Sequence, residues 1–333
     1  MYLITGAAGF IGFHTCEKLL KKNKKVYGID NIDNYYDPNL KKKRLKILQK
    51  YKNFKFLKID ICNKNKVNLI FKKKKFKFVI HLAAQSNVRH SIKFPEKYVD
   101  VNMGGFFNIL NCAKNNKIKH FIYASTSSVY GADKSFPSKE DFGANHPMQM
   151  YAATKRSNEL MAHTFSSLFN LPTTGLRFFT VYGPWGRPDM ALFKFTKNIL
   201  ENKKIDLFNN GNQTRDFVYI DDVVKCIILS VSKIPRINRK WFLKKPNPKS
   251  SYCPYRLINV GSDNPTKLST FIRLIEMYLG KKSKQKNLPF QKSDIIKTES
   301  SSQWCYEILK YKPKIKPTVG IKRFLDWYKN YYQ

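Results

Sequence analysis

Three side chains near the middle of the sequence have the types and spacing needed for proton transfer. Thr126 ends the segment "HFIYAST", and the hydroxyls of Ser127 and Ser128 follow it directly. Tyr151 and Lys155 are four positions apart in "YAATK", which places both on one face of a helix. A phenol has a pKa near ~10, and lowering it to roughly 7 requires about 4 kcal/mol. The lysine and a second nearby cation in a partly dry cleft can supply this, so we predict that Tyr151 acts as a base and Thr126 carries the proton.

A glycine-rich turn at the start of the chain is suited to binding a pyrophosphate. Gly6, Gly9 and Gly12 lie between a predicted strand at residues 2–5 and a predicted helix at residues 10–20. Glycines allow a ligand to approach the backbone, and the helix N-terminus offers free N–H groups. The next strand, "KVYGID", ends at Asp30, whose carboxylate can accept both ribose hydroxyls of an adenosine and would repel a 2′-phosphate. The pattern predicts a site for NAD rather than NADP.

Alternating strands and helices must position these side chains. Further predicted strands end at Asp60, Ala84 and Thr126, with predicted helices at residues 64–74, 95–115 and 151–170. This alternation predicts an α/β fold with a Rossmann-type doubly wound parallel sheet. Ligands bind such sheets at the carboxyl ends of the strands. The residues expected there are Asp60, Leu82, Ala83, Ala84, Asn102 and Ser125.

The chain divides unevenly in this interpretation. Residues 1–178 are predicted to form the NAD-binding domain, with return segments at about 216–232 and 256–262. Residues 179–333 are predicted to form a smaller mixed α/β domain that binds the substrate, because their strands are shorter and their loops longer. The final aromatic helix, "IKRFLDWYKNYY", is expected to serve packing rather than to form a site.

Composition limits the partners and the compartment. The 333 residues carry a formal net charge of +39, but lysines occur in nearly every predicted helix and loop. We therefore expect no nucleic-acid or membrane partner, although the charge should concentrate anionic metabolites. The six cysteines form no CxxC pair, so neither a metal site nor a disulfide framework is expected. Because no apolar run of ~18 residues and no signal peptide is present, we predict a cytoplasmic protein.

The whole chain, residues 1–333, resembles the extended short-chain dehydrogenase/reductases, and among these the UDP-glucuronate 4-epimerases. The most specific motifs are "YGIDNIDNYYDPNLKKKRL", "VYGPWGRPDMALFKF", "GNQTRDFVYIDDV" and "FLDWYKNYY". The resemblance implies reversible inversion at C4 of UDP-glucuronate to give UDP-galacturonate, through a transient 4-keto sugar and tightly bound NAD. It also implies a homodimer formed through the helices that contain residues 106–113 and 160–168.

The same resemblance implies roles for individual residues. The catalytic set is Tyr151, Lys155 and Thr126. The NAD-binding set is Gly6, Gly9, Phe10, Ile11, Gly12, Asp30, Asn31, Asp60, Ile61, Leu82, Ala83, Ala84, Asn102, Ser125, Tyr151, Lys155 and Phe178. The substrate set is Arg89, Thr126, Ser127, Ser128, Thr180, Arg187, Arg215 and Asp294. The two arginines of the later motifs suit their roles, since a planar guanidinium binds a carboxylate or diphosphate through two hydrogen bonds.

Some positions depart from the family pattern, and alternative functions stay open. Asn87 and His90 stand where glycine and tyrosine are usual, and "KSDII" replaces the usual Pro-Gly-Asp-Val around Asp294. A UDP-glucuronate decarboxylase or 4,6-dehydratase is one alternative, but residues 126–128 lack the acidic side chain that such enzymes carry there. A 4-epimerase of a neutral UDP-sugar is another, and Arg187 argues against it. A catalytically silent NAD-sensing or RNA-binding protein is favoured only by the charge.

Overall fold

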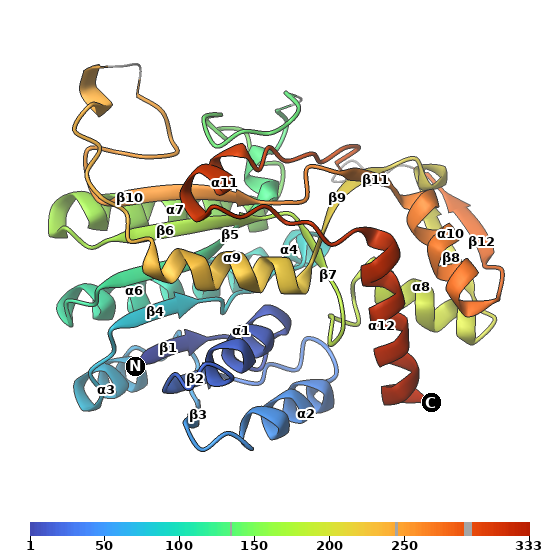
Figure 1. Ribbon diagram of the computed structural model, residues 1–333, viewed down its shortest axis with the longest axis horizontal. Helices are drawn as coiled ribbons and strands as arrows, with labels where there is room; N and C mark the ends of the chain where they lie inside the picture. The colour runs from blue at the N-terminus through green and yellow to red at the C-terminus, as the bar shows by residue number, and fades with distance from the viewer. Residues whose placement is uncertain (134, 244–245, 290–294) are drawn as a thin grey trace.

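The computed structural model describes residues 1–133, 135–243, 246–289 and 295–333. Its centre is a parallel seven-stranded sheet with the order β10-β6-β5-β4-β1-β2-β3 (Figure 1). The strands are β1 (Tyr2–Thr5), β2 (Val26–Asp30), β3 (Phe54–Lys58), β4 (Phe78–His81), β5 (His120–Thr126), β6 (Thr173–Phe178) and β10 (Tyr255–Val260). The strand order reverses direction between β1 and β4, which is where such sheets bind ligands. The predicted doubly wound α/β fold is confirmed.

Helices cover both faces of this sheet because neighbouring residues of each strand point to opposite sides. Leu3, Val79 and Phe121 pack in one apolar cluster with α3 (Lys64–Lys73), α6 (Phe106–Asn115) and α7 (Met150–Phe169). Ile4 and Ile80 pack in the other with α1 (Phe10–Leu20), α2 (Pro38–Leu48), α9 (Ile220–Ser232) and α11 (Gln303–Leu309). The carboxyl ends of the strands between these layers stay accessible to a ligand.

Several predicted elements end or change where side chains take over backbone hydrogen bonds. β4 stops at His81 rather than at Ala84: the amide of Leu82 is shared between the carbonyl oxygen and Oγ1 of Thr5, and the amide of Ala83 donates to the same Oγ1. β3 stops at Lys58, two residues before Asp60. The predicted helix at residues 95–115 is divided into α5 (Pro95–Tyr98), the π-helix η1 (Val99–Gly105) and α6. α4 (Val88–Lys93) precedes it, and the 3₁₀ helix η2 (Ser127–Tyr130) follows β5.

A second region is built around two small sheets and its own apolar core. The strands β11 (Pro265–Lys267), β9 (Thr214–Tyr219) and β7 (Thr180–Tyr182) form one sheet, and β12 (Lys284–Leu288) pairs with β8 (Lys204–Phe208). The helices α8 (Ala191–Leu200), α10 (Leu268–Leu279) and α12 (Pro317–Tyr332) pack against them. The short helices η3 (Asn209–Gly211) and η4 (Trp241–Leu243) lie in connections. This region borders the carboxyl edge of the large sheet.

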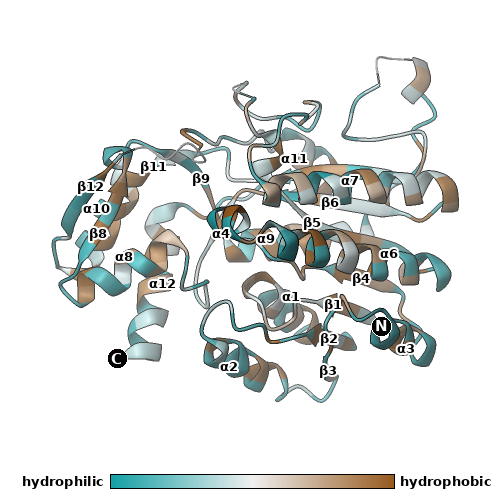
Figure 2. Ribbon diagram, turned by 180° about the vertical axis from the view of Figure 1, so that it is seen from behind, coloured by the Kyte–Doolittle hydropathy of each residue, from teal (hydrophilic) through white to brown (hydrophobic). Residues whose placement is uncertain are grey.

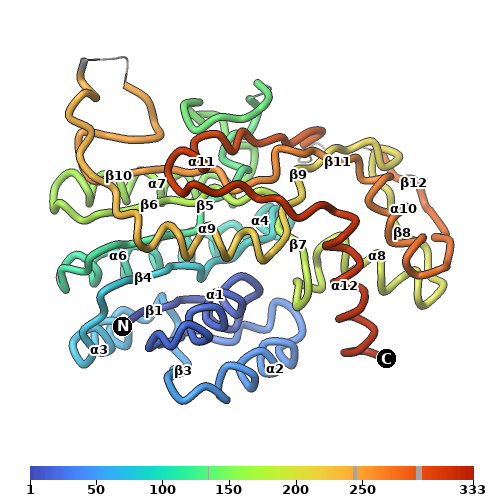
Figure 3. The backbone as a smooth tube through the Cα atoms, viewed as in Figure 1, coloured from blue at the N-terminus to red at the C-terminus, as the bar shows by residue number. Residues whose placement is uncertain are grey.

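Two later elements, β10 and α9, pack with the elements of the first half of the chain. β10 pairs with β6 at the edge of the large sheet (Figure 3). In the sequence, strands of the two small sheets lie between these two strands. α9 packs against α1. The division into two domains at residue 178 stays a prediction.

Figure 2 shows hydrophilic and hydrophobic residues alternating along α3, α8 and α10, as expected of helices with one face against a core. Among the described residues, no helix combines the length and the apolar character that crossing a bilayer requires.

Candidate active site

A cavity of about 720 Å³ opens between the carboxyl ends of the large sheet and the second region. Most of the predicted site residues line it. From the strand ends and the first turn these are Gly6, Gly9, Phe10, Ile11, Gly12, Asp30, Asn31, Asp60, Ile61, Leu82, Ala83, Ala84, Ser125 and Phe178. The predicted catalytic and substrate residues that line it are Thr126, Ser127, Ser128, Tyr151, Lys155, Arg89, Thr180, Arg187 and Arg215. Asp294 lies outside the described residues.

The glycine turn is packed so closely that side chains cannot be added to it. Gly6 has φ +69°, and a Cβ there would lie 2.8 Å from the amide nitrogen of Ala83. A Cβ on Gly12 would lie 2.0 Å from the carbonyl oxygen of Gly6. α1 begins at Phe10, directly after the turn, so its N-terminal amides face the cavity. A backbone cradle at a helix N-terminus fits a pyrophosphate.

Asp30 is held at the end of β2 by two backbone donors. The amide of Ala8 donates to its Oδ2 at 3.1 Å, and the amide of Ile32 donates to its Oδ1 at 2.8 Å. Burial raises the pKa of this carboxyl group, while those hydrogen bonds and the charges of Lys41 and Arg44 oppose the rise. Each carboxylate oxygen can accept more than one hydrogen bond, so Asp30 keeps acceptor capacity for ribose hydroxyls.

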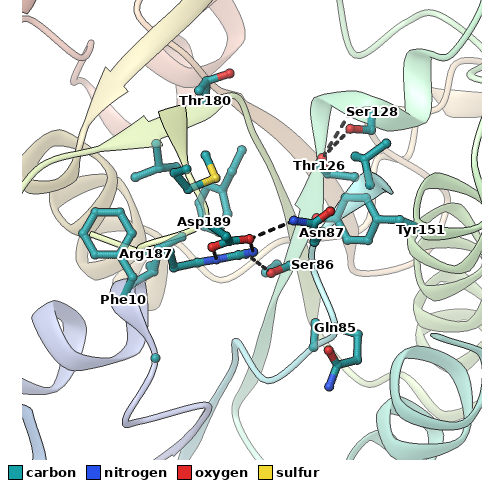
Figure 4. A pocket seen from close by; sticks show the side chains of 18 of the residues that line it. Phe10, Gln85, Ser86, Asn87, Thr126, Ser128, Tyr151, Thr180, Arg187 and Asp189 are labelled. Atoms are coloured by element: carbon teal, nitrogen blue, oxygen red, sulfur yellow. Dashed lines mark hydrogen bonds and ion pairs between the residues drawn. The ribbon is translucent and has the colours of Figure 1, made fainter. Parts of the chain in front are cut away.

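Tyr151 and Thr126 meet at the junction of α7 and β5. Burial raises the pKa of the Tyr151 phenol, whereas a hydrogen bond with Thr126 and the charge of Arg187 lower it. Thr126 also accepts a hydrogen bond from the amide of Ser128 at 3.2 Å. The hydroxyls of Thr126 and Ser128 and the ring of Tyr151 lie close together in Figure 4. The cavity therefore presents a phenol and a hydroxyl to the same position.

Lys155, which the sequence predicted would lower the pKa of Tyr151, is bound to the backbone of β5 instead. Its Nζ donates to the carbonyl oxygen of Ala124 at 2.9 Å, and burial lowers its pKa to about 8. In this structure the groups that lower the pKa of Tyr151 are Thr126 and Arg187, not Lys155. The sequence pattern shows that the two side chains share a helix face, but it does not show that the β5 carbonyl binds the ammonium.

Arg187 extends into the cavity and is paired with an acid that the sequence interpretation missed. Its Nε donates to Asp189 Oδ1 at 2.9 Å, its Nη2 donates to Asp189 Oδ2, and its Nη1 bonds to Ser86 (Figure 4). Asn87 and Tyr35 also donate to Asp189, at 2.8 Å and 3.2 Å. Arg187 holds the pKa of Asp189 below its usual value. The acid two positions after the arginine in "GRPD" is the signal that could have identified the pair.

The other predicted cationic residues lie farther along the cavity. The Arg89 guanidinium lies 4.2 Å from the ring centroid of Phe208 in the second region. Arg215 Nη1 donates to the carbonyl oxygens of Thr214 and Ile296 at 3.1 and 3.2 Å. Phe208 lines the cavity, and no motif in the sequence pointed to it.

Asn102 lies behind the cavity rather than in its lining. It is 1% exposed. Its Oδ1 accepts a hydrogen bond from the amide of Gln85 at 2.9 Å, and its Nδ2 donates to the carbonyl oxygen of Gln85 at 3.0 Å. Its Nδ2 also donates to Thr154 at 3.1 Å. These bonds fix the backbone of Gln85, which does line the cavity. Sequence alone could not show this, because it depends on the π-helical turn that contains Asn102.

The described residues contain no group of three His, Cys, Asp or Glu side chains suited to a metal ion.

A family model described as the NAD dependent epimerase/dehydratase family matches residues 2–240. The chain belongs to this family. The resemblance inferred from the sequence is confirmed at that level, and the glycine turn and Asp30 described above fit the family's cofactor.

This epimerase/dehydratase is similar to several known proteins along almost its whole length. It is 47% identical to Protein CapI of Staphylococcus aureus, with 99% of each chain covered. It is 40% identical to the UDP-glucuronate 4-epimerase of Thermodesulfobacterium geofontis, covering 98% of this chain and 96% of that one. A crystal structure of the UDP-glucuronic acid 4-epimerase of Bacillus cereus, in complex with UDP-glucuronic acid and NAD, matches with a TM-score of 0.88 and 33% identity, and 99% of each chain is covered.

Proposed function

We propose that this family member is an NAD-dependent UDP-glucuronate 4-epimerase, which converts UDP-glucuronate reversibly into UDP-galacturonate. One observation carries the assignment: a single cavity holds the glycine turn, the Tyr151–Thr126 pair and Arg187. These three parts match a dinucleotide, a sugar hydroxyl and a carboxylate. The relatives named for this activity cover nearly the whole chain.

The residues present fit NAD as the cofactor. The backbone of the Gly6–Gly12 turn would hold its pyrophosphate, and Asp30 would accept hydrogen bonds from the adenosine ribose. Lys155 and Tyr151 line the part of the cavity between β5 and α7, where the nicotinamide end would lie. When bound, NAD⁺ accepts a hydride from C4 of the sugar and later returns it. No net oxidation results, so the enzyme needs no second redox substrate.

The protein's own groups handle the proton. Tyr151 removes the proton from O4 as C4 becomes a ketone, and Thr126 contacts both the phenol and the sugar oxygen. When the 4-keto sugar has turned its opposite face to the cofactor, Tyr151 returns the proton to O4. Lys155, fixed by the Ala124 carbonyl, adds a positive charge to this side of the cavity.

A 4-keto uronic acid is a β-keto acid, so it loses CO₂ when its C5–C6 bond aligns with the ketone π system. Preventing this requires that the carboxylate be held in another orientation. We assign this role to Arg187, together with the hydroxyls of Thr180, Ser127 and Ser128, which line the same cavity. Arg215 and Arg89 lie farther along it and would serve the diphosphate and the nucleoside.

The site argues against two of the enzymatic alternatives. Elimination at C5–C6 in a 4,6-dehydratase requires a proton donor beside Tyr151, but positions 126–128 carry only hydroxyls. The nearby carboxylate of Asp189 is already bound to Arg187 through two hydrogen bonds. A neutral sugar would leave the cation of Arg187 without a negatively charged partner on the substrate.

The deciding experiment is incubation of the purified protein with UDP-glucuronate alone, followed by NMR of the anomeric protons. The proposal requires UDP-galacturonate to accumulate to a constant ratio without added NAD. Tyr151→Phe should keep NAD bound and lose turnover by ~10²–10⁴-fold, because a positioned base contributes about that much. A UDP-pentose or a 4-keto-6-deoxy sugar as the main product would overturn the assignment.

Exposed apolar side chains on α6 and α7 bear on the assembly of the protein. α6 and α7 expose Phe107, Leu160 and Leu168, with 44%, 55% and 69% of their surfaces accessible. An apolar patch on two neighbouring helices supports the predicted homodimer. Location in the cytoplasm stays a prediction from the sequence.

A further inference from the structure

Arg44 is a buried cation with no acidic side chain bound to it. This residue of α2 is 0% exposed, and among the described residues no carboxylate lies within salt-bridge distance of it. Its acceptors are the carbonyl oxygens of Ala8, Trp185 and Gly186 at 2.9, 2.5 and 3.4 Å, and the hydroxyl of Tyr36 at 2.8 Å. Its Nε has no acceptor in the described part of the chain. A buried unpaired donor is costly, so such an arrangement calls for an explanation other than stability.

The backbone acceptors of Arg44 belong to two loops that have different tasks. Ala8 lies in the glycine turn, and its own amide binds Asp30. Trp185 and Gly186 directly precede Arg187, the proposed carboxylate-binding residue. One guanidinium therefore connects the cofactor turn to the loop that carries Arg187.

The substrate loop is strained at the residue that Arg44 holds. Trp185 has φ +59°, in the left-handed region that a bulky side chain rarely adopts. Its ring packs against Phe13 of α1 and against Trp327 and Tyr331 of α12, with centroid distances of 5.6, 5.2 and 5.0 Å. Strain of this kind persists only where the surroundings enforce it, and it is common at functional sites.

We propose that Arg44 is a positioning residue that fixes the Trp185–Gly186 backbone against the cofactor turn, so that Arg187 selects a uronate carboxylate. The inference rests on the proposed function. Asp189 orients the Arg187 side chain from one side, and Arg44 orients its backbone from the other. α12, expected only to pack, contributes Trp327 and Tyr331 to the same support.

The chemistry requires arginine rather than lysine at this position. Nη1 bonds to Ala8 and Tyr36 while Nη2 bonds to Trp185 and Gly186. A lysine has one nitrogen and cannot span both loops in this planar arrangement. Arg44→Lys therefore keeps the charge and removes the connection.

The test compares UDP-glucuronate with UDP-glucose, as ratios of kcat/KM and as ratios of Kd by calorimetry on NAD-loaded protein. Arg44→Lys should lower the UDP-glucuronate to UDP-glucose ratio of kcat/KM, and raise the same ratio of Kd, by roughly 2- to 30-fold, the range expected for a residue that acts through another. In an Arg187→Ala background the same substitution should leave the ratios unchanged. Arg256→Lys is the matched control: Arg256 is also buried, donates to the Lys233 carbonyl and lies outside the cavity lining, so the ratios should stay at the wild-type values.

The proposal is overturned if Arg44→Lys leaves the ratios unchanged, or changes them equally with and without Arg187. If Arg44→Lys does not fold, Tyr36→Phe decides, since it removes one acceptor of Arg44 and should shift the ratios in the same direction by a smaller factor. Wild-type protein that converts no UDP-glucuronate would refute the proposed function instead. The Kd ratios would then still test Arg44.

Discussion

At the scale of single residues, the proposed base lies in surroundings that oppose its ionisation. Burial raises the pKa of Tyr151, and Thr126 and Arg187 act in the other direction. A base must lose its proton to act, so the ketone-forming step should be slow at pH values below the pKa of Tyr151 and faster above it. The hydroxyl of Thr126 then influences the reaction by lowering the pKa of Tyr151.

Thr126→Ala should shift the acidic limb of the kcat–pH profile to higher pH. The substitution removes a hydrogen bond that favours the phenolate, so the pKa of Tyr151 rises and a smaller fraction is ionised at neutral pH. Initial rates across the pH range, measured with saturating UDP-glucuronate, give the profile. Thr126→Ser keeps the hydroxyl and should retain the wild-type limb. Superimposable profiles for Thr126→Ala and wild type would remove Thr126 from this role.

Arg187→Ala should lose far more activity on UDP-glucuronate than on UDP-glucose. A charge-assisted hydrogen bond contributes about 1.5–3 kcal/mol, which changes the ratio of specificity constants by about ten- to a hundredfold. Asp189, mostly buried and deprived of its partner, would also repel the substrate carboxylate, and Asp189→Asn in the Arg187→Ala background should recover part of the loss. NMR should also detect some UDP-pentose. Equal losses on both sugars would assign Arg187 to the diphosphate.

Residue types and spacing predicted the cavity lining well but not its internal contacts. Tyr151, Thr126, Asp30 and the glycines have types that only a few local structures accommodate, and their neighbours in the chain define those structures. The hydrogen bond between Asn87 and Asp189 joins residues that are 102 positions apart in the sequence. Asn87 entered the interpretation only as a departure from the family pattern. No periodicity can show such a contact.

At the scale of elements, the predicted helix at residues 95–115 shows where local patterns stop being informative. Its ends were correct, but residues 99–105 form a π-helix. The hydrogen bonds from Asn102 to Gln85 and Thr154 hold this turn, and they come from outside the element. The strands β1, β2 and β5 ended where predicted: a glycine turn follows β1, the acidic Asp30 is the last residue of β2, and the hydroxyls of residues 127 and 128 follow β5.

α6 and α7 give a prediction about assembly. If their exposed apolar side chains form the dimer contact, Leu160→Glu should convert the protein to a monomer, because it buries a charge opposite apolar side chains. Light scattering after gel filtration measures the mass. Leu69→Glu on α3, where the side chain is similarly exposed at 50%, should leave the mass unchanged. A wild-type protein that is already monomeric would refute the predicted interface.

At the scale of the whole molecule, the charge of +39 should act on the rate of substrate capture. The KM for UDP-glucuronate should rise with ionic strength, since the screening length falls from ~30 Å at 0.01 M to ~3 Å at 1 M salt. The rise should be steeper than for UDP-glucose, which has one negative charge fewer. Steady-state kinetics in a chloride series measures both. A constant KM for UDP-glucuronate would show that the lysines serve no steering role.

The order of the strands has a consequence for the protein during its synthesis. β6 leaves the ribosome well before β10, its outer neighbour in the sheet. At roughly 5–20 residues per second, the nascent chain carries an unpaired parallel edge for several seconds. All six residues of β6 are buried in the finished protein, so this edge is a site for aggregation or for a chaperone. A fragment that stops at residue 240 would keep the edge open permanently.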